Sequence, residues 1–575
     1  FRDSLIQRID ILKATKSQIT DLIAALKLKV SKSFERNKEF LQENADNIYI
    51  VSNGFKDFII PIVGDYGIHQ DNVFANEFVY DDADNIVDFN RDNPLSQNNG
   101  KAETIKKINL EGEIYVIGDG YTDYEIKKSG LANKFYAFTE NVNRPKVTKE
   151  ADHIAPSLDE ILYVNNLNTK FSYPKSRIKV LLLENVHQIG VDLLKEEGYE
   201  VEVVSSAMSE EELCEKIKNV SIIGIRSKTN ITRKVLENAN RLIAVGAFCI
   251  GTNQIDLEGC QEKGIAVFNA PFSNTRSVVE MAIAEIIFLM RGFADKTAAL
   301  HQSKWDKSAS GSFEIRGKKL GIIGYGNIGA QLSVLAENMG MNVFYYDVIE
   351  RLALGNATKI ESLDELLSTC DVITLHVDGR KENENILDRS KIALMKKGAI
   401  LLNLSRGHVV EIPALRDAIL SGHLAGCAVD VFPEEPKNNS EPLVSELIGL
   451  PNTILTPHIG GSTSEAQENI ARFVPGKIME YINTGNTYNS VNFPNIQLPF
   501  LKNAHRLIHI HMNEPGVLAK INQILANFEI NIVGQYLKTN EKIGYVITDI
   551  DKAYSNEAID ALKHIPGTIR FRVLY

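Results

Sequence analysis

Apolar runs and amphipathic stretches alternate along most of the chain. Between residues 178 and 456, short apolar runs are separated by stretches with helical periodicity, a pattern typical of alternating strands and helices. This alternation predicts parallel, doubly wound sheets and therefore an α/β fold. The predicted strands are 178–183, 200–204, 221–225, 242–245, 319–324, 342–346, 372–376, 399–403 and 454–456.

The two ends of the chain follow other patterns. Residues 1–165 predict a further α/β domain, and the polar segment 166–177, which contains Pro174, predicts a linker. Residues 503–575 predict a small βαββαβ module. In these ends the predicted helices are 2–14, 18–28, 33–44, 517–527 and 556–564, and the predicted strands are 47–51, 113–117, 507–511, 544–550 and 569–574.

Length and charge narrow the classes of function. A chain of 575 residues corresponds to about four domains. Its 63 basic and 74 acidic residues give a net charge of −11, which argues against general binding to nucleic acid or to an anionic membrane. The five cysteines form no CxxC pair, which favours free thiols in a reducing, cytoplasmic compartment. Because the sequence begins at Phe1 rather than Met, we expect a segment upstream of it.

A glycine-rich turn follows the predicted strand 319–324. In Gly324-x-Gly326-x-x-Gly329 the first glycine permits a tight turn, the second lets the backbone approach a pyrophosphate, and the third allows close packing of helix on strand. The next predicted strand ends at Asp347, whose carboxylate suits the ribose hydroxyls of NAD and repels the phosphate of NADP. Glycine-rich turns also serve packing alone, but strand, helix and acid together favour an NAD site.

Three polar segments follow later apolar runs and bring candidate catalytic residues. Arg406, Glu435 and His458 lie in these segments, and the carboxyl ends of strands are where open α/β sheets bind ligands. Oxidation of an alcohol by hydride transfer needs a base, and a His held by a carboxylate fits that role. An Arg fork would hold a substrate carboxylate. Taken singly, each residue is as well explained by an ion pair, by solvation or by a capping role.

Long motifs make the sequence similar to the D-2-hydroxyacid dehydrogenase family. They include GAFCIGTNQID from Gly246, RGKKLGIIGYGNIG from Arg316, DVFPEEP from Asp430 and TPHIGGST from Thr456. The resemblance implies a discontinuous substrate-binding domain at 178–272 and 462–495 around an NAD-binding domain at 273–461. It also implies His458 as acid/base, Glu435 as its partner and Arg406 as substrate anchor. The NAD-binding residues it implies are Gly324, Gly326, Asn327, Ile328, Gly329, Asp347, Leu404, Ser405, Arg406, Asp430, His458, Ile459, Gly460 and Gly461.

Within this family the sequence closely resembles those members that oxidise 3-phospho-D-glycerate to 3-phosphohydroxypyruvate with NAD⁺, the first step of the phosphorylated route to L-serine. By this resemblance Arg226, Ser227 and Asn274 face the substrate, and Arg226 with Lys228 suits a 3-phosphate. Two alternatives stay open. One is a dehydrogenase for another 2-oxo acid, such as 2-oxoglutarate, which is also expected as a side activity. The other is a non-catalytic module that responds to serine.

The C-terminal module resembles an ACT domain, which binds amino acids and often pairs between subunits. In the serine-inhibited dehydrogenases a His and two Asn matching His511, Asn513 and Asn531 hold L-serine across a dimer interface. Amide and imidazole groups together satisfy an ammonium, a carboxylate and a hydroxyl. The resemblance thus implies L-serine as an allosteric inhibitor and a homo-oligomer, dimer or tetramer. The alternative is an ACT domain that serves assembly only.

The N-terminal domain resembles a haloacid-dehalogenase-type phosphatase acting on phosphoserine. By this resemblance Ser52 and Lys101 bind phosphate, Arg8 contacts phosphoserine together with Phe1, and Asp119 holds Mg²⁺ with support from Asp123. The DxDxT strand that supplies the nucleophile is absent before Ser52, so we expect it upstream of Phe1. The alternative is a degenerate domain. Overall the sequence predicts a fusion protein of serine biosynthesis.

Overall fold

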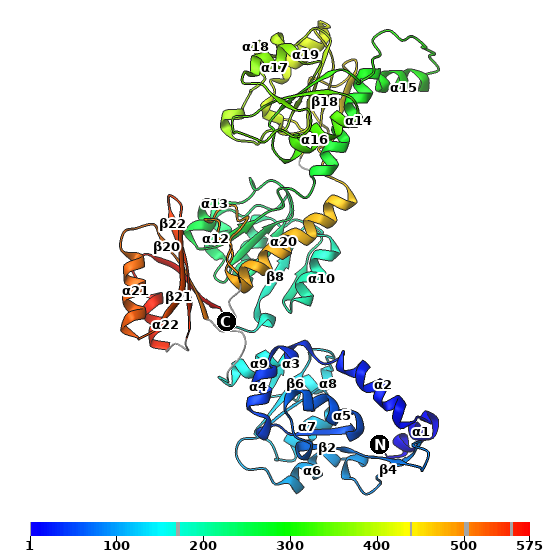
Figure 1. Cartoon of the computed structure of the whole chain (residues 1–575), viewed down its shortest axis with the longest axis vertical. Helices are drawn as coiled ribbons and strands as arrows, with labels where there is room; N and C mark the ends of the chain where they lie inside the picture. Colours follow the sequence, from blue (N-terminus) through cyan, green and yellow to red (C-terminus); the bar gives the residue numbers. More distant parts are fainter. Residues whose placement is uncertain (1, 168–172, 437–439, 500–504, 552–555, 575) are drawn as a thin grey trace. The chain divides into compact units, whose positions relative to one another are not determined.

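The computed structural model describes residues 2–167, 173–436, 440–499, 505–551 and 556–574. Parts of two predicted segments, the linker 166–177 and the module 503–575, therefore lie outside the described residues, as does Phe1. The chain divides into two compact units, 1–179 with 198–200 and 499–575, and 180–197 with 201–498. Figure 1 shows the elements in chain order. No helix in the described ranges is long and apolar enough to cross a membrane.

A parallel sheet with the order β15-β14-β13-β16-β17-β18-β19 forms the core of residues 275–461. The chain order reverses between β13 and β16, so the loops after these strands meet at one edge of the sheet. Its strands are β13 (Lys319–Ile323), β14 (Asn342–Tyr346), β15 (Thr358–Lys359), β16 (Val372–Leu375), β17 (Ala399–Asn403), β18 (Leu424–Val429) and β19 (Thr453–Leu455). Its helices are α14 (Thr275–Arg291), α15 (Phe293–His301), α16 (Asn327–Asn338), α17 (Leu363–Thr369), α18 (Arg389–Leu394) and α19 (Ile412–Leu420).

A second parallel sheet has the order β12-β11-β10-β8-β9. Helix α20 (Ser464–Thr484) returns to it from far along the sequence and packs against α10, β11 and β12 (Figure 1). Gly246 makes this approach possible, because a Cβ there would lie 2.8 Å from the Val474 and Ile478 side chains. The other elements are β8 (Lys179–Leu182), α10 (Gln188–Glu196), β9 (Glu200–Val203), α11 (Glu210–Lys216), β10 (Ile222–Ile225), α12 (Arg233–Asn238), β11 (Ala244–Ala247), α13 (Leu257–Glu262) and β12 (Ala266–Phe268).

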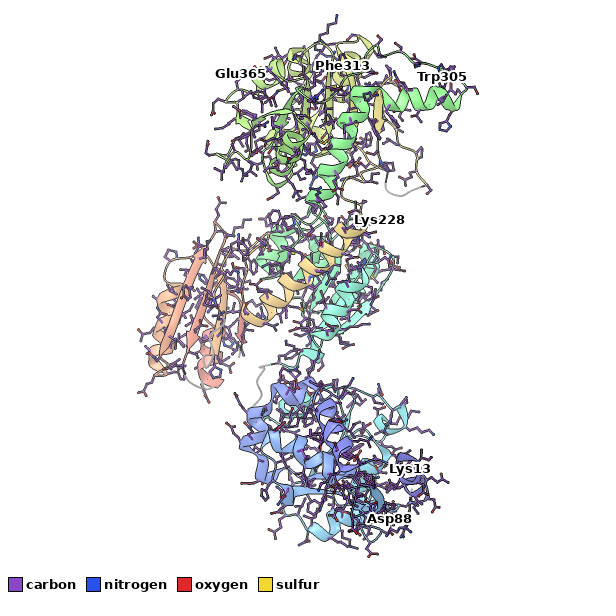
Figure 2. The ribbon with its side chains drawn as sticks, turned by 45° about the vertical axis from the view of Figure 1, so that its right-hand side comes forward. Lys13, Asp88, Lys228, Trp305, Phe313 and Glu365 are labelled. Carbon is purple, nitrogen blue, oxygen red and sulfur yellow. The ribbon has the colours of Figure 1, made fainter. Side chains whose placement is uncertain are left out.

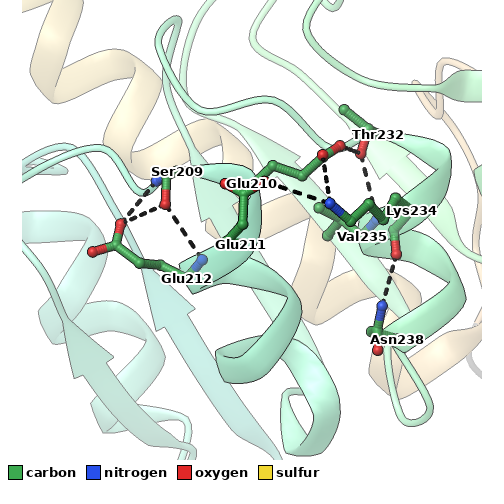
Figure 3. Close-up of polar contacts among 8 residues, drawn as sticks. All are labelled: Ser209, Glu210, Glu211, Glu212, Thr232, Lys234, Val235 and Asn238. Carbon is green, nitrogen blue, oxygen red and sulfur yellow. Dashed lines mark hydrogen bonds and ion pairs between the residues drawn. The ribbon is translucent and has the colours of Figure 1, made fainter.

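Helices α11 and α12 begin at side-chain caps that Figure 3 shows together. The Ser209 hydroxyl accepts from the Glu212 N–H, and the Glu212 carboxylate accepts in return from Ser209. The Thr232 hydroxyl caps α12 in the same way through the Val235 N–H. Such caps satisfy N–H groups that have no partner within the helix, so the sequence fixes where each helix starts.

The C-terminal sheet is antiparallel, with the order β21-β22-β20-β23. Strand β22 is buried along its whole length, while α21 and α22 cover the apolar core around Leu507, Ile521 and Val546. The predicted helix 517–527 is confirmed residue for residue. The elements are β20 (His505–Met512), α21 (Val517–Asn527), β21 (Ile532–Thr539), β22 (Ile543–Ile550), α22 (Asn556–Lys563) and β23 (Thr568–Leu574).

The N-terminal domain contains two separate parallel pairings, β1-β2 and β5-β6-β7, and an antiparallel pair β3-β4. The predicted helix 33–44 is wrong as a single helix: it breaks at Asn37, whose buried amide donates to Ser33 and Asp159. The strands are β1 (Ile50–Phe55), β2 (Val73–Asn76), β3 (Phe78–Tyr80), β4 (Ile86–Phe89), β5 (Tyr115–Gly118), β6 (Lys134–Phe138) and β7 (His153–Ala155). The helices are α1 (Arg2–Leu12), α2 (Lys16–Lys27), α3 (Lys32–Arg36), α4 (Lys38–Glu43), α5 (Lys56–Val63), α6 (Gly100–Ile108), α7 (Tyr121–Lys128), α8 (Pro145–Thr148) and α9 (Leu158–Val164).

Candidate active site

The glycine-rich turn connects β13 to α16. Gly324 has a φ of +91°, and a Cβ there would lie 2.7 Å from the carbonyl oxygen that follows β16. A Cβ on Gly329 would lie 2.4 Å from the Gly324 carbonyl oxygen, so the third glycine is needed for close packing. Gly326 caps α16, whose first residues are Asn327 and Ile328, and a Cβ on it would meet no atom within 4 Å. The space before the helix N-terminus is therefore open to a phosphate group.

Asp347 follows β14 and faces the same turn. One of its carboxylate oxygens accepts from the Tyr325 N–H at 2.8 Å, and the other accepts from the Ile349 N–H at 2.9 Å. Arg351 lies 3.8 Å from the first oxygen. Each carboxylate oxygen has two acceptor positions, so ribose hydroxyls can still donate to it. A pocket of about 620 Å³ adjoins the turn, lined by Arg276, Tyr325, Gly326, Asn327, Ala330, Gln331, Val334, Leu335, Arg351, Leu352 and Leu354.

The loop after β17 is fixed by its own side chains. The buried Asn403 amide oxygen accepts from both the N–H and the hydroxyl of Ser405, and its amide nitrogen donates to the Arg406 carbonyl. Gly407 lets this loop touch the loop after β18, since a Cβ there would lie 1.9 Å from the Phe432 carbonyl carbon. The Arg406 side chain is half-buried and donates to the Ser405 carbonyl at 2.7 Å. Among the other predicted NAD-binding residues, Leu404 is buried and Ile459 is exposed.

Asp430 braces the loop after β19. Its carboxylate, 2% exposed, accepts from the Thr456 hydroxyl at 2.6 Å and from the N–H groups of Ile459 and Gly460 at 2.8 Å each. The His458 N–H also donates to the Asp430 carbonyl at 2.9 Å. These bonds hold His458 at a φ of +53°, a conformation that non-glycine residues rarely adopt. Such strain at an isolated His indicates a functional position.

His458 and Glu435 form the pair that the sequence predicts. The His458 Nδ1 lies 2.9 Å and 3.1 Å from the two oxygens of Glu435. This hydrogen bond and the negative charge raise the pKa of His458 above its ordinary value. Partial burial alone would raise the pKa of Glu435, but the bond and charge of His458 outweigh it and the pKa lies below its ordinary value. Arg406 is close enough to act on both pKa values, so the three residues share one site.

The predicted substrate-facing residues lie in two places of the same unit. Arg226 and Ser227 follow β10, where Arg226 is half-buried and Ser227 is exposed. Asn274 precedes α14 and packs against Gly461, where a Cβ would lie 2.3 Å from its amide nitrogen. Asn274 therefore contacts Gly461, three residues after His458, in the segment where the chain passes from one sheet to the other.

The three residues of the predicted serine site do not meet within one chain. Asn513 donates to the Asn540 carbonyl and lies beside the start of β22, while Asn531 donates to Asp551 just past the end of β22. This strand has 8 residues and so spans about 25 Å. His511 is 3% exposed and lies at the Asn513 end.

In the N-terminal domain the predicted charged residues form separate pairs. Lys101 and Asp123 form a largely buried ion pair at 2.5 Å, and Asp119 pairs with Arg144 at 3.2 Å. Across the described part of the chain, no three His, Cys, Asp or Glu side chains are grouped to hold a metal ion. The Mg²⁺ site expected at Asp119 depends on the Asp motif expected upstream of Phe1 and so stays a prediction.

The other two residues predicted for this domain lie at β1 and α1. The Ser52 hydroxyl, within β1, accepts from the Gly54 N–H at 3.0 Å. Arg8 is exposed on α1.

Comparison with known proteins shows which class of enzyme the chain resembles. The family model of the D-isomer specific 2-hydroxyacid dehydrogenase NAD-binding domain matches residues 283–460, and that of the AHAS small subunit-like ACT domain matches residues 507–570. The structure of D-2-hydroxyisocaproate dehydrogenase is 25% identical, with a TM-score of 0.50 over 55% of this chain and all of that one. The fold and site are those of an NAD-dependent oxidoreductase.

Curated relatives show to which enzyme family within this class the chain belongs. D-3-phosphoglycerate dehydrogenase of Escherichia coli K12 is 51% identical over 71% of this chain and 100% of its own length. The enzyme of the same name from Dictyostelium discoideum is 50% identical over 70% of this chain and 99% of its own length. The chain belongs to the D-3-phosphoglycerate dehydrogenase family.

Sequence reasoning missed two acidic residues near this site. Glu184 follows β8 and binds the loop that carries Arg226, and Glu285 is buried in α14 near Asp430. A lone Glu after an apolar run or inside an apolar helix carries no pattern that distinguishes it, so only the structure reveals these two.

Proposed function

We propose that the chain oxidises 3-phospho-D-glycerate to 3-phosphohydroxypyruvate with NAD⁺, as the first step of the phosphorylated route to L-serine. The observation that carries the proposal is the His458–Glu435 pair, 2.9 Å apart and close to Arg406. The name of the relatives, about 50% identical over their full length, supports this substrate.

The residues of the site supply a general base, a cation that binds the substrate carboxylate, and a turn that can hold the cofactor. Nδ1 of His458 is engaged by Glu435, so Nε2 is the nitrogen that accepts the proton of the substrate C2 hydroxyl. The raised pKa of His458 favours that transfer, since Glu435 stabilises the imidazolium that forms. The guanidinium of Arg406 binds the substrate carboxylate. In the reverse direction His458 returns the proton to the oxo group.

The residues around the glycine-rich turn fit NAD. The open space before α16 would hold the pyrophosphate on the N–H groups of Asn327 and Ile328, and Asp347 would hold the ribose. When bound, NAD⁺ supplies the acceptor for the hydride of substrate C2.

The test follows absorbance at the NADH band with 3-phosphohydroxypyruvate as substrate, with and without L-serine. Rapid NADH loss supports the proposed reaction, and slowing by serine supports the regulatory role of the ACT domain. A folded sample that binds NADH but does not oxidise it refutes the reaction. A substrate panel that includes 2-oxoglutarate then separates a different dehydrogenase from a non-catalytic module.

L-serine inhibition is the proposed role of His511, Asn513 and Asn531. Asn513 and Asn531 lie at opposite ends of β22, so a two-fold axis beside this sheet would bring Asn531 of one copy to His511 and Asn513 of the other. Single-chain geometry therefore fits a ligand shared between two copies better than a site within one.

A homo-oligomer is also proposed, and exposed aromatic side chains of the NAD-binding domain support it. Trp305 is 81% exposed and Phe313 is 50% exposed in the segment after α15 (Figure 2). Phe288 and Phe293 stack at 4.6 Å and are both exposed. Aromatic residues are enriched at protein interfaces. Analytical ultracentrifugation tests this, and a monomer at micromolar concentration would refute it.

A phosphatase-like role of the N-terminal domain is proposed only for a chain that carries the upstream Asp motif. Its support is that β1-β2 and β5-β6-β7 are both parallel, and that Ser52 lies within β1 while Asp119 directly follows β5. One more parallel strand between β1 and β5 would join them into one sheet. Hydrolysis of phosphoserine in the presence of Mg²⁺, measured on the chain with its upstream segment and lost without it, tests this role.

A further inference from the structure

A buried carboxylate stands at the end of β8. Glu184 is 7% exposed and has a φ of +61°, a conformation unusual for a residue with a side chain. Its backbone N–H donates to the Ser206 carbonyl at 3.2 Å, which holds the chain in this turn. Burial of a carboxylate without hydrogen-bond partners is unfavourable, so a buried carboxylate is held by the groups that donate to it. These donors therefore indicate the role of Glu184.

All three hydrogen bonds to the Glu184 carboxylate come from one loop. One oxygen accepts from the N–H groups of Arg226 at 3.2 Å and Thr229 at 2.8 Å, and the other accepts from the N–H of Lys228 at 2.9 Å. This loop follows β10 and carries Arg226, Ser227 and Lys228. Lys228 is exposed and is labelled in Figure 2.

A second buried side chain holds the other side of the Arg226 backbone. The Gln254 amide, in a residue 7% exposed, donates to the Arg226 carbonyl at 2.6 Å. Glu184 and Gln254 therefore fix the peptide groups before and after the Arg226 Cα. The direction in which the Arg226 side chain leaves the loop is set by two residues that are themselves hidden from a ligand.

The far end of the loop is anchored separately. Thr232 caps α12, and its hydroxyl donates to the Glu210 carboxylate, which also binds Lys234 at 3.1 Å (Figure 3). Among the described residues, the hydrogen bonds of this anchor join Glu210 to Thr232 and Lys234 and not to Arg226 or Lys228. The chain thus offers one carboxylate that holds the cationic half of the loop and another that holds its distal end.

We propose that Glu184 is a positioning residue of the substrate site, which orients Arg226 toward the phosphate of a phosphorylated 2-hydroxy or 2-oxo acid. The inference rests on the proposed function and adds a cause for phosphate specificity. A guanidinium binds phosphate through two parallel N–H bonds, so its affinity depends on the angle at which the side chain is presented. Glu184 supplies that angle without contacting the ligand.

The test compares reduction of 3-phosphohydroxypyruvate and of unphosphorylated hydroxypyruvate by the full chain. The variants are Glu184→Gln, Arg226→Gln, the double variant, and Glu210→Gln as the matched control. Gln at 184 places an NH₂ group against an N–H donor, so the loop loses a bond while the side-chain volume is kept. NADH affinity, measured by fluorescence, reports that the cofactor site is intact.

Glu184→Gln is expected to raise the KM for 3-phosphohydroxypyruvate about tenfold, as for loss of one hydrogen bond to a charged group, with kcat nearly unchanged. The KM for hydroxypyruvate should stay the same, and Glu210→Gln should match the wild type on both substrates. The double variant should have the KM of Arg226→Gln alone, because Glu184 acts through Arg226.

Two results would overturn the inference: an equal rise in KM for both substrates, or additive effects of the two substitutions. If Glu184→Gln does not fold, Gln254→Met gives the second test, with the same split between substrates expected and an equal rise on both refuting it. A wild-type chain that reduces hydroxypyruvate but not its phosphorylated form refutes the proposed substrate, and the inference with it.

Discussion

Glu285 should make the stability of the NAD-binding domain depend on pH. It is 4% exposed in α14, and neither of its carboxylate oxygens has a hydrogen-bond partner among the described residues. Burial, with a smaller effect of the Asp430 charge, raises its pKa from 4.5 to about 8. The folded domain therefore keeps this carboxyl protonated at pH 7, whereas the unfolded chain ionises it.

The direction and the size of this pH effect on the free energy of unfolding follow from the difference in Glu285 pKa between the folded and unfolded states. Below pH 4.5 the carboxyl is protonated in both states and adds no pH dependence to stability. Between pH 4.5 and 8 only the folded state holds the proton, so stability falls as pH rises. The slope is about 1.4 kcal/mol per pH unit. Between pH 5.5 and 7.5 the wild type should lose about 2.5 kcal/mol that Glu285→Gln does not lose.

Scanning calorimetry measures this difference. The transition of the NAD-binding domain is the one that NADH shifts upward. The quantity to compare is the Tm of Glu285→Gln minus the Tm of the wild type. This difference should be larger at pH 7.5 than at pH 5.5 by about 5–10 °C, because a domain of this size shifts by about 2–4 °C per kcal/mol. Glu280→Gln is the control, because that side chain is 60% exposed and paired with Arg276 on the same helix. Parallel pH curves for wild type and Glu285→Gln would show that the carboxyl ionises normally, and the reasoning would fail.

Four further outcomes are expected. His458→Ala should lower turnover by about 100-fold or more, as for loss of an acid–base group, with NADH affinity kept; full turnover would remove His458 from the mechanism. Glu435→Gln should move the fall in 2-oxo acid reduction to lower pH, because His458 loses the partner that raises its pKa and so loses its proton earlier; an unshifted kcat/KM profile would contradict this. Asp347→Ala should raise NADP⁺ use relative to NAD⁺ about tenfold by removing a like charge, and an unchanged ratio of kcat/KM values would refute the ribose assignment. Asn513→Ala or Asn531→Ala should relieve serine inhibition with uninhibited activity intact, whereas an unchanged inhibition curve would exclude the site.

The sequence predicts most of the fold wherever a strand or helix is recognisable by itself. The strands 342–346 and 399–403 have the predicted bounds, because each is a continuous apolar run between turns. Strand β18 escapes prediction because its sequence LAGCAV is made of small residues. Gly426 in it must be small, since a Cβ there would lie 2.2 Å from the Asn452 carbonyl oxygen, which is a contact far along the sequence. A propensity argument does not contain such a contact.

The candidate site shows the same division. The three glycines could be predicted from their spacing after a strand, and His458 with Glu435 from the family resemblance that the motifs around them carry. The way in which Asp430 braces its loop could not, since its carboxylate accepts from loop groups 26 to 30 residues away. Glu184 reaches still further, to N–H groups 42 to 45 residues away. Every residue except proline has a backbone N–H, so the sequence does not indicate which residue donates such a hydrogen bond.

These carboxylates share one arrangement that explains how the site can be both rigid and open. Glu184, Asp347 and Asp430 each follow a parallel strand, and each accepts backbone N–H groups of a loop at the same end of its sheet. Loop conformation is therefore set by buried or partly buried acids, which leaves the Arg226 guanidinium and the His458 Nε2 for ligands. It follows that replacing a ligand-facing side chain should alter binding or turnover with little change in Tm. Replacing one of the bracing acids should alter loop geometry first, and chemistry only through it.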